Sequence, residues 1–253
     1  MSNVNKENKI GFLLLGLSLA MGMIISAFIV SLTIERVKLA NEKITVKGFA
    51  EKRITSDIAV WKSKVIVRSS NIKAAYEKLE QNLGKVIFYF EKQGIKKEKL
   101  DIFSVSTLTR HKYNEKGYLT NEISGYVLEQ IIEINSDNVQ LISRLSKEST
   151  SLIKEGVEFI SLVPRYYYSK FDEIKIQLIG EATKNAKLRA DQFAENSGLK
   201  VGNLKSATQG VFQVTPVNST EISGYGRYDT TTIEKSVKAV VTIDYSIRKS
   251  LKE

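Results

Sequence analysis

The 253-residue sequence contains no cysteine, one histidine and two prolines. Without cysteine, the chain has no disulfides, no thiolate metal ligands and no cysteine nucleophile. A single histidine, His111, would leave a zinc or copper ion with carboxylates as its other ligands, so we expect no metal site and no cofactor. The two prolines, Pro164 and Pro216, are too few for a proline-rich stalk or linker.

The sequence also lacks the short motifs of common catalytic sites, namely the GxSxG elbow, the Walker lysine motif and HExxH. The segment 224–226 (Gly-Tyr-Gly) has neither the third glycine nor the strand-then-helix setting of a dinucleotide site, and we interpret it as a loop. Glu129 and Glu133 are four residues apart in an expected strand, so their side chains would lie on the same face. We interpret them as solvated and salt-bridged, and we predict that the protein is not an enzyme.

One uncharged stretch stands out at residues 10–34, which are 25 residues without a charged side chain. As a helix this stretch would be about 37 Å long, enough to cross a hydrocarbon core about 30 Å thick. We predict an uncleaved transmembrane anchor here, preceded by a short tail of residues 1–9. The alternative is a cleaved signal peptide. Residues 18–20 (Ser-Leu-Ala) loosely match a cleavage site, but the apolar region of a signal is usually about 7–15 residues long.

Charge does not orient this span, because Lys6 and Lys9 on one side balance Arg36 and Lys38 on the other. The formal net charge of the whole chain is +10. Such a balance favours polyanionic partners, among them acidic lipids and cell-wall polymers.

After a polar linker at residues 35–43, we expect one domain at residues 44–253. Alternating or β-branched runs predict its strands, at residues 44–48, 57–69, 100–113, 118–135, 157–169 and 237–247. Apolar residues at three- and four-residue spacing predict three helices, at residues 70–93, 136–155 and 172–196. This order predicts an α+β fold, a largely antiparallel sheet with about three helices on one face, preceded by one N-terminal transmembrane helix.

The helix patterns also assign buried faces. In the first helix of the domain, Leu79 and Leu83 are expected in the middle of the apolar stripe. In the last helix an alanine recurs every fourth residue between residues 182 and 194, and Phe193 is expected on the same inward face. Pro164 has no N–H to give to a neighbouring strand, so we expect an edge position or a bulge there.

Two short segments could form binding surfaces. The run Arg165, Tyr166, Tyr167 and Tyr168 combines aromatic rings with a cation, a composition that is common in interfaces and ligand sites. The alternative for this run is packing at a strand end.

Lys62, Lys64 and Arg68 would form a basic stripe on one strand, for which the alternative is an ordinary solvated face.

Three segments together resemble the SIMPL-domain family of bacterial envelope proteins, which includes a periplasmic immunogenic protein. They are the opening strand at 44–50, the helix at 74–95 with its terminal glycine, and the alanine-rich helix and glycine turn at 182–202. The likeness spans roughly residues 44–247. It implies an α+β domain outside the cytoplasmic membrane, often oligomeric and linked to envelope or stress tolerance, and it brings no catalytic residues. Many relatives have cleaved signals, whereas the apolar stretch of this chain is longer.

We therefore expect a single-pass protein of the cytoplasmic membrane, anchored by residues 10–34, with its C-terminal domain extracytoplasmic. The expected role is non-enzymatic and depends on homo-oligomeric assembly or binding, with β edges and residues 166–168 as the assembly surface. An anionic envelope polymer is a further candidate partner, and nucleic acid is not expected. Two alternatives remain: a polyanion- or cell-wall-binding module, and a hydrolase that acts on wall material.

Overall fold

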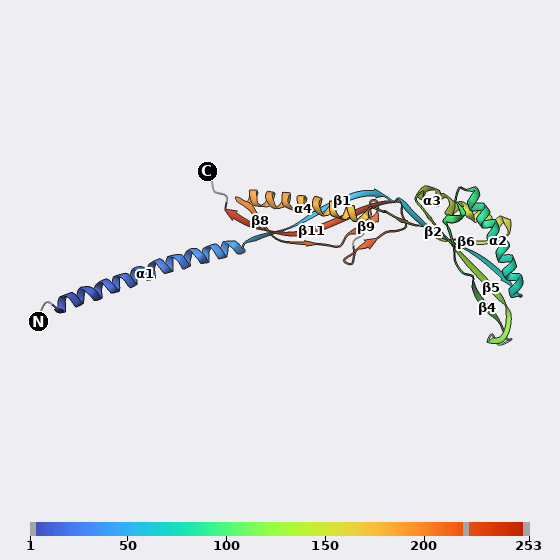
Figure 1. The fold of residues 1–253 in the computed structure, drawn as a ribbon, viewed down its shortest axis with the longest axis horizontal. Coiled ribbons are helices and arrows are strands. Elements are labelled where there is room, and N and C mark those ends of the chain that lie inside the picture. The colour runs from blue at the N-terminus through green and yellow to red at the C-terminus, as the bar shows by residue number, and fades with distance from the viewer. Residues whose placement is uncertain (1–3, 220–222, 250–253) are drawn as a thin grey trace. The chain divides into compact units, whose positions relative to one another are not determined.

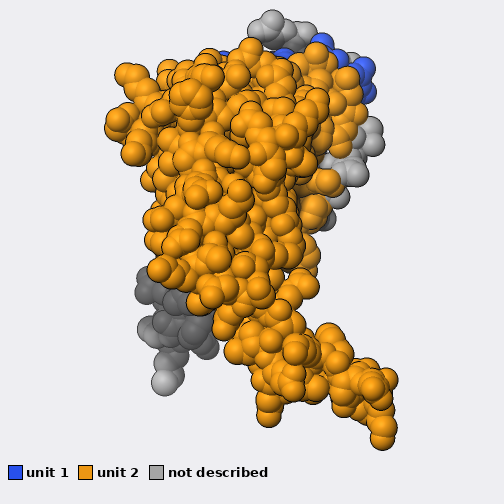
Figure 2. All heavy atoms as spheres, turned by 90° about the vertical axis from the view of Figure 1, so that its right-hand side faces the viewer, with its two compact units in different colours: residues 1–50, 177–210, 239–253 blue, residues 51–176, 211–238 orange. Residues whose placement is uncertain are grey.

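The computed structural model describes residues 4–219 and 223–249 (Figure 1). The fold is α+β with mostly antiparallel sheets, as the sequence predicts. Contacts divide the chain into two compact units, which are coloured separately in Figure 2. Unit 1 comprises residues 1–50, 177–210 and 239–253, and unit 2 comprises residues 51–176 and 211–238.

The apolar stretch lies in the long N-terminal helix α1 (Val4–Asn41). Its segment Gly16–Ile34 has a mean hydropathy of 2.2, is long enough to cross a membrane, and has no buried residue. α1 continues to Asn41, so most of the expected linker 35–43 is helical, and β1 begins at Lys43. The expected tail 1–9 is helical from Val4, and its first three residues lie outside the described part of the chain.

Unit 1 contains most of the helix α4 (Phe171–Asn196) and parts of the strands β1 (Lys43–Thr55), β8 (Leu199–Gln209) and β11 (Glu234–Lys249). β8 pairs with β11 in antiparallel register. The buried face of α4 confirms the alanine pattern, and its members are Leu178, Ala182, Ala186, Ala190 and Ala194.

Phe193 is 61% exposed, so the prediction of an inward Phe193 is wrong. The reason is that neighbouring helix positions do not face each other, and Ala194 takes the inward direction.

A close approach between β1 and α4 explains two of the segments that carry the family resemblance. A Cβ on Gly48 would lie 2.0 Å from the carbonyl oxygen of Ala182 and 2.7 Å from the Cβ of Ala186. Beside this contact, the N–H of Phe49 donates to Oδ1 of Asn185 over 3.1 Å. The absence of a side chain at position 48 and the methyl groups on α4 therefore let strand and helix backbones meet.

A carboxylate ties three strands of unit 1 together. Asp244 on β11 accepts hydrogen bonds from Lys43 Nζ (2.6 Å), Thr45 Oγ1 (2.6 Å) and Ser206 Oγ (2.9 Å). These hydrogen bonds, that of Lys43 foremost, lower the pKa of Asp244 to about 2.

Unit 2 is built on a six-stranded antiparallel sheet with the order β3-β5-β2-β6, in which β4 also pairs with β5 and β7 with β2. Its strands are β2 (Ile58–Ser69), β3 (Leu100–Ile102), β4 (Ser106–Tyr113), β5 (Leu119–Ser136), β6 (Glu158–Ser161) and β7 (Arg165–Tyr167). The helices α2 (Ile72–Lys92) and α3 (Val139–Glu148) cover one face of this sheet (Figure 1). Unit 2 also contains the short 3₁₀ helices η1 (Lys97–Lys99) and η2 (Ser149–Glu155) and the strands β9 (Gln213–Pro216) and β10 (Arg227–Tyr228).

The core of unit 2 lies between the helices and the inner face of β2. Its alternate residues Ala59, Trp61, Ser63, Val65 and Val67 are buried, as the alternation in the sequence predicts. The ring of Trp61 meets the ring of Phe90 on α2 edge to face, with 5.4 Å between centroids.

Two expected strands are interrupted. The first arm of the expected hairpin, residues 100–113, is divided into β3 and β4, because residues 103–105 leave the ladder. The expected strand 157–169 is divided into β6 and β7 around Pro164, which confirms the predicted disruption at the proline.

The inward face of α2 differs in part from the expected stripe. Leu79 is 1% exposed, whereas Leu83 packs against the core but is only half-buried. We therefore expect Leu79→Ala to lower the free energy of unfolding by about 2–5 kcal/mol, as for a fully buried leucine. Leu83→Ala should cost about 1 kcal/mol, because its side chain already contacts water. Denaturant unfolding of both variants tests this, and equal losses would contradict it.

We expect Gly48→Ala to destabilise unit 1 by at least about 1–3 kcal/mol, because the added methyl group overlaps α4. The matched control is Gly180→Ala on α4, where an added Cβ meets nothing within 4 Å. Alanine is a better helix former than glycine, so the control should gain about 0.5–1 kcal/mol. Thermal unfolding in which both variants shift the same way would contradict the close approach.

Candidate functional site

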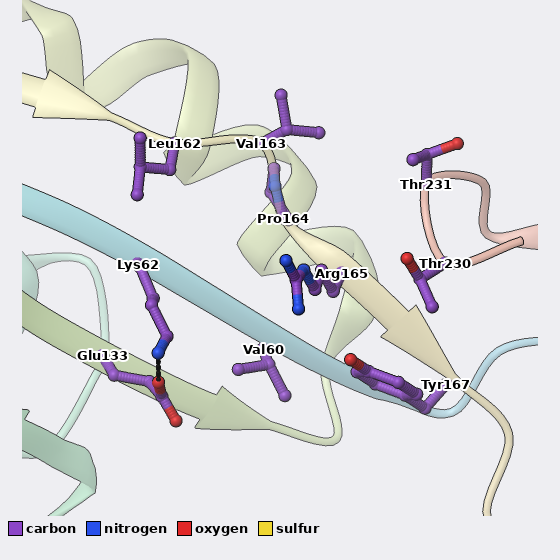
Figure 3. Close-up of a pocket in the computed structure, with 10 residues that line it drawn as sticks. All are labelled: Val60, Lys62, Glu133, Leu162, Val163, Pro164, Arg165, Tyr167, Thr230 and Thr231. Atoms are coloured by element: carbon purple, nitrogen blue, oxygen red, sulfur yellow. Dashed lines mark ion pairs between the residues drawn. The ribbon is translucent and has the colours of Figure 1, made fainter.

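A cavity of about 710 Å³ lies on the face of the six-stranded sheet that points away from α2 and α3 (Figure 3). Such a volume is typical of small-molecule sites. The residues that line it are Val60, Lys62, Glu133, Leu162, Val163, Pro164, Arg165, Tyr167, Thr230 and Thr231. All of them belong to unit 2.

Strand register explains why these side chains share one face. Val60 pairs with Arg165 of β7, and Lys62 pairs with Glu133 of β5. Directly opposed residues of an antiparallel pair point to the same side of the sheet. Arg165 and Lys62, which belong to two separate surfaces in the sequence prediction, therefore line the same cavity.

The charges in the cavity are unequally compensated. Lys62 Nζ lies 2.8 Å from Glu133 Oε2 and 5.4 Å from the ring centroid of Phe103. The guanidinium of Arg165 forms no hydrogen bond or ion pair with any residue in the ranges 4–219 and 223–249. The lining therefore carries one uncompensated positive charge, and it is exposed.

One wall of the cavity comes from a segment distant in sequence, Thr230 and Thr231. The backbone N–H of Tyr166 donates to the carbonyl of Thr230 over 2.7 Å, and that of Ser56 donates to the carbonyl of Ile233 over 2.9 Å. These hydrogen bonds fasten the segment beside β7 and the start of β2. Neither threonine is among the residues that the sequence pattern indicates, because nothing in a Ser/Thr-rich loop shows which strand it will contact.

A buried charged cluster of Asp229 and Lys235 stabilises the turn that contains Thr231. The side chain of Lys235 is 2% exposed, and its Nζ donates to the carbonyl of Asp229 (2.8 Å) and lies 3.3 Å from Asp229 Oδ2. Oδ1 of Asp229 accepts from the N–H (2.9 Å) and the hydroxyl (2.7 Å) of Thr231, and Oδ2 accepts from Thr232. The lysine and the carboxylate are thus satisfied by each other and by the turn.

Burial acts on both pKa values in this cluster. It alone would raise the pKa of the Asp229 carboxyl, but the hydrogen bonds from Thr232 and Thr231 and the charge of Lys235 hold that pKa well below its usual range. Burial also lowers the pKa of Lys235, against the opposing effect of Asp229. The cluster therefore stabilises the turn that carries Thr230 and Thr231.

The tyrosine run is divided by the alternation of β7. Tyr166 is 5% exposed and belongs to the hydrophobic core, which agrees with packing and removes it from any surface. Tyr167 is half-buried and lines the cavity, whereas the half-buried Tyr168 does not.

The basic stripe is largely neutralised. Lys64 Nζ lies 2.7 Å from Glu129 Oε1, and Arg68 is paired with Glu158. With Lys62 on Glu133, each cation of the stripe has a carboxylate partner, as expected for a solvated, salt-bridged face.

We expect Lys235→Met to lower the free energy of unfolding by about 3–5 kcal/mol, because it leaves the Asp229 carboxylate buried without its cation. The matched control is Lys112→Met, which removes an exposed ion pair with Glu122 and should change the free energy of unfolding by less than about 1 kcal/mol. Denaturant unfolding compares the two variants. Similar small losses would show that the cluster does not support the wall.

Comparison with known proteins gives a family but no activity. The model of the family SIMPL, described as "Protein of unknown function (DUF541)", matches residues 44–245. No curated protein was found to match the chain.

Two solved structures show a low similarity. A de novo designed protein, Foldit4, is 16% identical with a TM-score of 0.23, and the match covers 42% of this chain and 93% of that one. A hydrolase from Listeria innocua is 10% identical with a TM-score of 0.19, and the match covers 78% of this chain and 91% of that one. TM-scores this low carry no argument about fold or chemistry. The family match, by contrast, extends over most of the sequence and confirms the resemblance, so the chain belongs to the SIMPL family.

Proposed function

We propose that this SIMPL protein is anchored in the cytoplasmic membrane by α1, carries its two units outside the cytoplasm, and has a non-enzymatic role in the cell envelope through assembly or binding. The observation that carries this proposal is the apolar segment Gly16–Ile34, none of which is buried against the protein. An uncharged, predominantly apolar helix whose side chains are all exposed is stable in a lipid environment. A cleaved signal peptide is the competing reading of the same helix.

The extracytoplasmic location has two supports. The family resemblance implies it, and a chain of 253 residues without cysteine is unaffected by an oxidising compartment. Binding is supported by the cavity with its uncompensated Arg165. A catalytic role lacks support, because the residues that line the cavity include no cysteine and no histidine to serve as nucleophile or general base.

Assembly is supported by an arm made of β4 and the first part of β5. β2 pairs with β5 only from Tyr126 onward, so residues 119–125 pair with β4 alone. This hairpin is the lowest part of unit 2 in Figure 1, and unit 2 ends in a narrow projection at the same level in Figure 2. An unpaired strand edge offers backbone N–H and C=O groups to another chain.

Side chains on this arm also favour contact with a second copy. Tyr113, Leu119 and Ile123 are 69%, 61% and 49% exposed. Tyr113 pairs with Leu119 in the ladder, so these two side chains share a face. In the other candidate for assembly, the run 166–168, Tyr166 is buried in the core and Tyr167 lines the cavity. We therefore place self-association at the arm, with a second copy of the chain as the partner.

We expect protease added to intact spheroplasts to degrade the two units, and the mature protein to keep an N-terminus before Ile10. Immunoblotting with antibodies to the C-terminal part, with mass spectrometry of the N-terminal peptide, reads both outcomes. A protected protein would contradict the orientation. A soluble product that starts between residues 21 and 35 would instead identify a cleaved signal.

We expect the detergent-solubilised full chain to sediment as an oligomer whose fraction rises with salt, because salt screens the repulsion between copies with a net charge of +10. Ile123→Lys on the arm should shift the population to monomer. The control Ile153→Lys changes a side chain that is 56% exposed on η2 and should have no effect. A wild-type monomer at both low and high salt would overturn the assembly role.

A further inference from the structure

Arg165 is the one charged group of the cavity lining that has no partner among the described residues. Its side chain points toward the part of the cavity that contains Val60 and the Lys62–Glu133 pair (Figure 3). A guanidinium presents several N–H donors in a planar fork that matches a carboxylate in two-point contact. The hydroxyls of Tyr167 and Thr230 lie in the same lining and can donate further hydrogen bonds.

The charge balance selects the class of anion. Lys62 is already paired with Glu133 at 2.8 Å, so Arg165 alone is available to a ligand. A dianion such as a phosphate monoester would bring a second negative charge close to the Glu133 carboxylate without a second free cation to offset it. A monoanionic carboxylate leaves the cavity neutral.

Apolar side chains define the rest of the ligand. Val163 is 74% exposed and Leu162 is 37% exposed, and both belong with Val60 to the cavity lining, at the end of β6 and in the turn before β7 (Figure 3). Removing such surface from water on binding is favourable in proportion to its area. We propose that the cavity binds a small organic acid, in which one carboxylate pairs with Arg165 and an apolar group covers Leu162 and Val163.

The wall that contains Thr230 and Thr231 is already ordered by hydrogen bonds before a ligand binds. The segment that carries Thr230 is fixed by the Tyr166 hydrogen bond and by the buried Asp229–Lys235 cluster. A site that is already ordered loses less conformational freedom when a ligand binds. The inference deepens the binding role proposed above and rests on it only for the source of the acid, because the cavity itself lies within unit 2.

The test is a binding titration of the full chain in nanodiscs, because detergent tails would compete for the apolar wall. Ligand-observed fluorine NMR would follow 4-fluorophenylacetate, with 4-fluorophenylacetamide and 4-fluorophenyl phosphate as the neutral and dianionic comparisons and empty nanodiscs as blank. 4-Fluorophenylacetate should bind saturably. 4-Fluorophenylacetamide and 4-fluorophenyl phosphate should bind at least about tenfold more weakly, since a hydrogen bond to a charged group contributes about a tenfold gain in affinity.

Arg165→Gln should weaken binding of the acetate at least about tenfold, and Arg165→Lys, which keeps the charge but loses the fork, should weaken it less. The matched control is Arg68→Gln, which removes one positive charge from the same face of the sheet, on β2 and outside the cavity lining, and should leave affinity unchanged. Arg165 is exposed, so the folded state should persist, and circular dichroism of each variant checks this.

Three results would overturn the proposal: no saturable binding of the acetate by the wild type, equal binding of the amide, or equal affinity in Arg165→Gln and Arg68→Gln. Poly-L-glutamate separates a small acid from an acidic polymer. Poly-L-glutamate should not displace 4-fluorophenylacetate. Displacement at equal carboxylate concentration would show that the site binds an acidic polymer. None of these readouts depends on membrane orientation or oligomer size, so they stand apart from the tests of anchoring and assembly.

Discussion

The two-residue alternation of strand β2 is the constraint on which the organisation of unit 2 depends. One set of its side chains, with Trp61 at the centre, is buried under α2 and α3 and is apolar except for Ser63. The other set faces the open side of the sheet, where Lys62 and Lys64 meet carboxylates of β5. The core and the ion-paired face are therefore the two sides of one strand. The cavity lies on the ion-paired side, between the Lys62–Glu133 pair and Arg165.

The second wall of the cavity shows how a long-range contact is stabilised in a chain without disulfides. Burying Lys235 and Asp229 costs solvation free energy, which their mutual hydrogen bonds and those of the Thr231–Thr232 turn offset. The segment is thus held by side-chain hydrogen bonds as well as by the backbone hydrogen bond to Tyr166. In unit 1 the long-range contact between β1 and α4 depends on close packing instead, because Gly48 has no side chain and lets the backbone of α4 approach.

Much of this could be predicted from local patterns. The alternation of β2, the alanine face of α4 and the disruption at Pro164 each follow from a period or from one missing N–H, and the structure contains them. Leu83 faces the core as predicted but is only partly buried, and the inward prediction for Phe193 is wrong. Both residues lie at the margin of an apolar stripe, where a small rotation of the helix decides exposure. Thr230 joins the site through a backbone hydrogen bond to Tyr166, and no sequence period encodes such a contact.

The most direct measurement uses the absence of cysteine from the whole chain. Val163→Cys would place a single thiol on the exposed wall of the cavity, where the valine is 74% exposed. If the cavity lies outside the cytoplasmic membrane, a membrane-impermeant maleimide should label this thiol in intact spheroplasts as fully as after lysis. Labelling that requires lysis would place unit 2 in the cytoplasm and contradict an envelope role for this SIMPL protein.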